Sequence, residues 1–243
     1  MNQRSVPTAF AAAALTLLAA PAAQAQQWLV NSVIQNQIVE TAICDSAVKK
    51  HEKLPDICAK YPKYAAGAPT QNAAPATSRA AAASAKFSPV AGDDSLQKIA
   101  DSLGGDAQER QQMLQLVTAG KQLFEQKYAG KGWTDNVAGA FAFFIVATST
   151  VYTDKEPSAA AQDNLFVALE STLAQSPDLA KASAREKTAL YNSLAACAGL
   201  SLLFYIDGKQ QGNAAEVGKA REMAAGFSRK LLNTEPQALA AML

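Results

Sequence analysis

After residue 87 the apolar residues recur every three or four positions, which is the spacing of one face of an α-helix. Three such stripes are Leu116, Gly120, Leu123, Phe124 and Tyr128; Leu165, Leu169 and Leu173; and Val217, Ala220, Ala224, Phe227 and Leu231. No segment alternates apolar and polar residues in the way a half-buried strand does. The pattern predicts an all-α fold, with residues 87–243 forming a bundle of about six helices.

Capping residues mark where these helices should begin. In four segments a capping residue is followed three positions later by a residue whose side chain can accept from the cap's backbone amide. These segments are Asp106-x-x-Glu109, Ser183-x-x-Glu186, Asn213-x-x-Glu216 and Thr234-x-x-Gln237. A fifth start is indicated by Ser176-Pro177, because proline is favoured at the first helical position. Helix ends are predicted at glycine pairs and turns: Gly104-Gly105, Gly130-Lys131-Gly132 and Asp207-Gly208.

Two segments, residues 137–152 and 194–206, carry no charge and are apolar on every side. Both are shorter than the roughly 20 residues that span a bilayer, so they are predicted to be central core helices. Small residues in them are expected to let the two backbones approach closely: Gly139, Ala142, Ala147, Ala195 and Gly199.

The first 25 residues have the pattern of a cleavable secretory signal. Arg4 precedes an apolar run over residues 9–20, and Ala23-Gln24-Ala25 supplies the small residues that signal peptidase requires. Cleavage is predicted between Ala25 and Gln26, giving a periplasmic or secreted protein. Because residue 26 is not a cysteine that could be acylated, no stable membrane anchor is expected.

The mature chain is predicted to have two parts joined by a linker. Residues 26–64 should form a small helical module, stabilised by a disulfide between Cys44 and Cys58, whereas Cys197 should be buried and free. Residues 65–86 lack large apolar side chains and are predicted to be a disordered linker. Residues 87–243 form the main domain.

Net charge argues against a nucleic-acid partner. Removal of the signal takes away Arg4 and leaves 21 basic residues against 21 acidic ones. Proteins that bind nucleic acid carry a basic excess on one face, because phosphate contacts dominate their affinity. The mature chain is formally neutral, so no nucleic-acid partner is predicted.

The most specific stretch of the sequence is Gly130-Lys131-Gly132-Trp133-Thr134-Asp135-Asn136-Val137-Ala138-Gly139-Ala140, which leads into an apolar helix. With Phe87-Ser88-Pro89 at the start of the domain, it resembles a family of exported, all-helical bacterial proteins of unknown function. The resemblance covers most of residues 87–243 and leaves the signal, the cysteine module and the linker outside it. It implies secretion and a helical fold, and it implies no catalytic or ligand residue.

Two interpretations of this stretch remain open. Thr134, Asp135 and Asn136 have the side chains that accept hydrogen bonds from the first amides of a helix, which favours a structural role. Alternatively, Lys131, Trp133 and Asn136 could form the rim of a binding site, since a helix N-terminus favours an anion. These three residues are called the candidate rim below.

The sequence offers little for catalysis. His51 is the single histidine and lies in the small module, which excludes a Ser-His-Asp triad in the main domain, and no cofactor or metal site is predicted. Carboxylates near helix ends are the remaining candidates: Glu125, Asp135, Asp154, Glu156, Asp163 and Glu170.

Two functional hypotheses follow. The first is a non-enzymatic module that binds an unknown protein or a small apolar ligand in the cell envelope. The alternative is a hydrolase that uses two carboxylates, for instance on cell-wall polysaccharide. Whether the protein is an enzyme stays open, and the first hypothesis is preferred.

Overall fold

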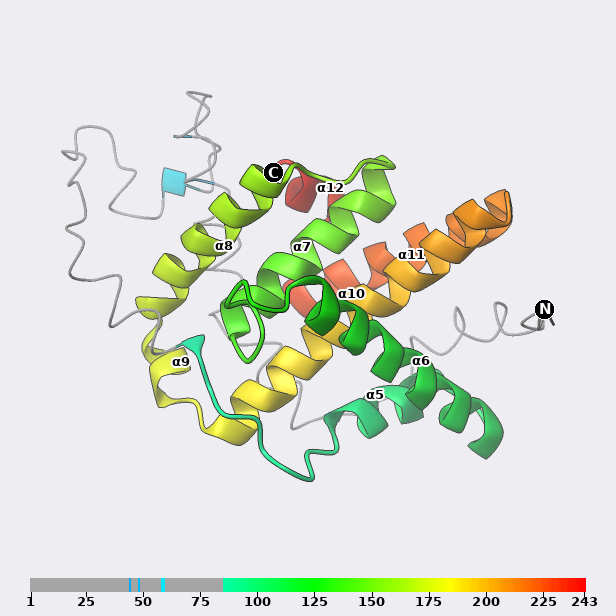
Figure 1. The fold of residues 1–243 in the computed structure, drawn as a ribbon, viewed down its shortest axis with the longest axis horizontal. Coiled ribbons are helices and arrows are strands. Elements are labelled where there is room, and N and C mark those ends of the chain that lie inside the picture. The colour runs from blue at the N-terminus through cyan, green and yellow to red at the C-terminus, as the bar shows by residue number, and fades with distance from the viewer. Residues whose placement is uncertain (1–43, 45–47, 49–57, 60–84) are drawn as a thin grey trace.

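The computed structural model describes residues 44, 48, 58, 59 and 85–243. Within 85–243 it contains eight helices, six of them nine residues or longer, which confirms the prediction of an all-α fold with about six packed helices (Figure 1). The helices are α5 (Ser95–Leu103), α6 (Ala107–Lys127), α7 (Val137–Thr153), α8 (Ala159–Ala174), α9 (Pro177–Lys181), α10 (Ala184–Gln210), α11 (Ala214–Leu232) and α12 (Pro236–Ala240).

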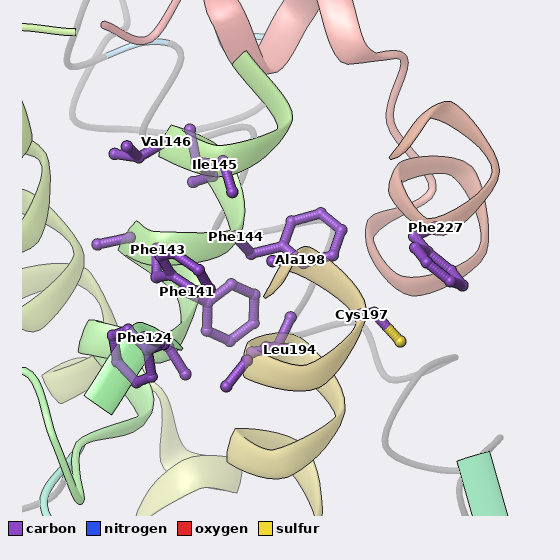
Figure 2. Packing of buried hydrophobic residues seen from close by; sticks show 14 of the residues in the cluster. Phe124, Phe141, Phe143, Phe144, Ile145, Val146, Leu194, Cys197, Ala198 and Phe227 are labelled. Atoms are coloured by element: carbon purple, nitrogen blue, oxygen red, sulfur yellow. The ribbon is translucent and has the colours of Figure 1, made fainter. Parts of the chain in front are cut away.

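Helices α7 and α10 form the centre of the bundle. They pack against each other; α5, α6 and α11 pack on α10, and α8, α11 and α12 pack on α7. Figure 2 shows Phe141 and Phe144 of α7 beside Leu194 and Ala198 of α10. By length and composition α10 is apolar enough to cross a membrane, but 72% of its apolar window is buried inside the fold. Both apolar segments are core helices, as predicted.

Four of the five predicted helix starts have the expected caps. The side chains of Asp106 and Ser183 accept from the amides of Glu109 and Glu186 in complete capping boxes. At the other two starts, Asn213 caps α11 and Ser176 caps α9. Local sequence decided these starts because each cap needs only side chains within three residues of the amide.

The start predicted at Thr234 was wrong. Helix α12 begins at Pro236 and is preceded by Glu235, which makes no side-chain cap. Thr234 Oγ1 instead donates to the carbonyl of Leu232, 2.8 Å away. Asn233, with φ 48°, ends α11 in the left-handed conformation. The threonine hydroxyl therefore satisfies a carbonyl at the end of α11 and does not cap the start of α12.

The helix end predicted at Asp207-Gly208 was also wrong, because α10 continues to Gln210. The chain turns instead at Gly212, where φ is +65°. Gly208 lies inside α10 against the start of α11: a Cβ added there would be 3.0 Å from the amide nitrogen of Val217. This glycine allows two helices to approach closely and does not end a helix.

The two glycines predicted to bring α7 and α10 together make other contacts. A Cβ on Gly199 of α10 would lie 2.1 Å from the carbonyl oxygen of Gly120, which belongs to α6. A Cβ on Gly139 of α7 would lie 2.0 Å from the carbonyl oxygen of Trp133, in the preceding turn. Close backbone approach was foreseen, but the partner elements were not.

One hydroxyl in the described core has no partner. Thr148 Oγ1, on α7, is buried and makes no hydrogen bond, whereas Thr150 Oγ1 donates to the carbonyl of Val146. A buried polar atom that has lost water without gaining a partner costs about 1–3 kcal/mol.

Thr148→Val is therefore expected to raise the free energy of unfolding by about 1 kcal/mol, because it removes the orphan hydroxyl and keeps the side chain's volume. Urea denaturation measures it. Thr148→Ser keeps the hydroxyl, loses a methyl group and should lower stability. A valine variant less stable than wild type would mean that the hydroxyl has a bonding partner.

The structure joins Cys44 to Cys58, with Cα atoms 5.7 Å apart, and leaves Cys197 free and buried. Burial raises the pKa of the Cys197 thiol to about 12, which keeps it protonated and unreactive at neutral pH. Residues 1–25, and all but a few of residues 26–84, lie outside the described residues. Ala85 is buried and Lys86 forms an isolated bridge with Asn136, so the described domain includes the last two residues of the predicted linker.

Candidate functional site

The candidate rim lies in the junction between α6 and α7, residues 128–136. Three residues here have left-handed backbone: Gly130 and Gly132 at φ +77° and Asp135 at φ 52°. Glycine adopts this region without a steric penalty, so the two glycines let the chain reverse sharply between two long helices. The amide of Phe87 donates to the carbonyl of Asp135 over 3.0 Å and ties the domain's first residues to the junction.

Trp133 is a core side chain, 1% exposed. Its ring stacks on Tyr128, with centroids 4.1 Å apart and planes 6° from parallel. Phe166 of α8 stacks on it with centroids 5.1 Å apart. Trp133 thus joins the end of α6, the junction and α8, and its burial agrees with the structural interpretation of the motif.

Asn136 is the N-cap of α7 and is fully buried. Its Oδ1 accepts from the amide of Ala138 over 3.0 Å. Its Nδ2 donates to the carbonyl of Gly132 over 3.2 Å and to Glu170 Oε1 of α8 over 2.8 Å. Since both amide hydrogens and the oxygen have partners, this side chain is committed to the fold.

Lys131 is the exposed member of the candidate rim. Its Nζ lies 3.7 Å from Asp163 Oδ1 on α8, and both side chains are about half exposed. An ion pair of this kind contributes little stability. The structure therefore leaves Lys131 facing solvent and places Trp133 and Asn136 in the interior.

A second polar contact joins the junction to α8. The Tyr128 hydroxyl donates to Gln162 Oε1 over 2.7 Å, and Gln162 Nε2 donates to the carbonyl of Pro157 over 2.8 Å. Burial, with smaller contributions from Glu156 and Asp163, raises the pKa of Tyr128, so the phenol remains a donor throughout the physiological range.

The candidate carboxylates are spread over the fold, and five of them accept a hydrogen bond from, or form an ion pair with, another side chain. Glu125 accepts from Lys121 and Tyr191, Asp154 from Tyr205 and Lys209, Glu156 from Lys127 and Gln162, Glu170 from Asn136, and Asp163 pairs with Lys131. Hydrogen bonds from Tyr205 and Lys209 lower the pKa of Asp154, and one from Lys127 lowers that of Glu156. A general acid needs the opposite shift.

The lowered pKa of Glu156 predicts a dependence of stability on pH. Its folded-state pKa lies below the unfolded value, so its contribution is present above about pH 4.5 and is lost as pH falls through the folded pKa. Glu156→Gln should therefore melt below wild type at pH 6, and the difference should shrink towards pH 3. Calorimetry across this range measures it.

The matched control for that series is Glu222→Gln, on the exposed side of α11. This variant should track wild type at every pH. A gap between Glu156→Gln and wild type that stays constant from pH 6 to pH 3 would contradict a role for the Lys127 contact.

Glu216, which the sequence indicated only as part of a helix cap, is a carboxyl whose pKa is shifted upward, the direction that a general acid needs. The pKa of Glu216, at the start of α11, is raised by burial and further by neighbouring Asp207. Its amide is capped by Asn213 Oδ1 over 3.2 Å, and its Oε2 accepts from Asn213 Nδ2 over 3.2 Å. These contacts hold Glu216 in the first turn of α11, next to Gly208 of α10.

A family model described as a family of unknown function, DUF6683, matches residues 4–234, which is nearly the whole chain. The chain belongs to the DUF6683 family. The match includes the N-terminal residues that the resemblance had left outside, so that boundary was wrong. No curated protein and no solved structure matches the DUF6683 chain.

The contacts through which this DUF6683 chain holds α8 to the junction were not predicted from the sequence. Gln162, Phe166 and Glu170 are spaced four residues apart and contact Tyr128, Trp133 and Asn136 respectively. The four-residue spacing is present in the sequence, but two of the three side chains are polar. The apolar stripe through Leu165 and Leu169 was therefore predicted to be the buried face of this helix. Among the described residues, no group of three or more His, Cys, Asp and Glu is placed to hold a metal ion.

Proposed function

We propose that this DUF6683 chain is an exported helical domain that acts by binding a protein of the cell envelope and not by catalysis. The observation that supports the proposal most is that the Asn136 side chain is fully hydrogen-bonded within the fold, which leaves it no group for a substrate. The side-chain oxygen of this residue accepts from Ala138, and its side-chain N–H groups donate to Gly132 and Glu170. The motif that looked most specific in the sequence thus supports a structural role.

The packing of the core favours a protein partner bound on the outer surface of the bundle, and it argues against a small apolar ligand bound between the helices. Buried aromatic and aliphatic side chains occupy the space between α7 and α10, including Phe141, Phe144 and Leu194 (Figure 2). A partner would therefore contact the outward faces of the peripheral helices. Export is supported by Arg4, the apolar run over residues 9–20 and Ala23-Gln24-Ala25.

Export predicts a defined N-terminus. Protein recovered from the periplasm or the medium should begin at Gln26, or at its cyclised form, and intact-mass spectrometry measures this directly. Replacing Ala23 and Ala25 by bulky residues should block processing, since signal peptidase requires small side chains there. Recovery of exported protein that still begins at Met1 would contradict the proposal.

Partner binding is tested with a photo-reactive residue placed, one position at a time, on three separate helices: at Gln111 of α6, Val167 of α8 and Glu222 of α11. Binding to one protein predicts a discrete cross-linked band from one face only, which excess unlabelled mature protein should suppress. Diffuse products of equal yield from all three helices would contradict the proposal.

The hydrolase alternative has a separate test, because Glu216 beside Asp207 supplies the one raised carboxyl pKa found among the described residues. Catalysis by this pair predicts that the mature protein releases reducing sugar from purified cell-wall polysaccharide and that Glu216→Gln abolishes the release. The proposed binding function predicts no release above a heat-denatured control for either protein. Release that depends on Glu216 would overturn the non-enzymatic assignment.

A further inference from the structure

We draw no further inference here: the strongest candidate, the outward-facing surface of α8 around the exposed Val167, carries nothing because nothing in the structure shows what covers it.

Discussion

Replacing Trp133 by alanine is expected to lower the free energy of unfolding by about 3–5 kcal/mol, the range for truncating a large buried aromatic side chain. Trp133 is 1% exposed, and its ring lies between those of Tyr128 and Phe166. Removing it takes away the ring contacts that join the end of α6 to α8 and leaves a cavity in the core. Urea denaturation, followed by circular dichroism, measures the loss.

Two further variants separate the structural role from a binding role. Trp133→Phe keeps an aromatic ring in the stack and should lose clearly less stability than alanine. Tyr152→Ala removes a more exposed aromatic ring, on α7, and should cost less than Trp133→Ala. A Trp133→Ala variant as stable as wild type would contradict the structural role and make the junction a candidate binding surface again.

Gly199→Ala is expected to cost about 3 kcal/mol, at the upper end of the usual range for overpacking. The added methyl would lie 2.1 Å from the carbonyl oxygen of Gly120, and this neighbour is backbone, which cannot rotate away. Helices α6 and α10 would have to separate along their contact. Gly120→Ala tests the same contact from the other side, since its Cβ would lie 2.7 Å from the amide nitrogen of Leu200.

Gly218→Ala is the matched control, because it makes the same substitution inside a helix. A Cβ at Gly218 of α11 meets nothing within 4 Å, so alanine should raise stability there by about 0.5–1 kcal/mol through its better helix propensity. The two substitutions should therefore have effects of opposite sign. If Gly199→Ala were also stabilising, the close approach of α6 and α10 would be wrong.

Features that depend on a few neighbouring residues could be predicted from the sequence. The capping boxes at Asp106 and Ser183 were foreseen because each is complete within four residues. The two uncharged segments were predicted to be core helices because they are apolar on every side and too short to span a bilayer.

Features that depend on distant partners could not be predicted. The sequence shows that Gly199 is small but not that Gly120, on another helix, lies against it. The same limit explains the error at Gly208. The sequence shows a glycine that could end a helix, but not that this glycine lies inside α10 against α11. At the junction, the role of Trp133 depends on Phe166, which lies on α8 and is 33 positions along the chain.

The structural role of the junction is tested most directly by measuring whether Trp133 is buried, which tryptophan fluorescence reports. The chain has two tryptophans, so Trp28→Phe leaves Trp133 as the single emitter. If Trp133 is buried, the folded variant should emit at shorter wavelength than the same protein unfolded in guanidinium, and acrylamide should quench its emission far less. Emission and quenching equal to those of the unfolded chain would show Trp133 in water and would contradict the structural role of the junction.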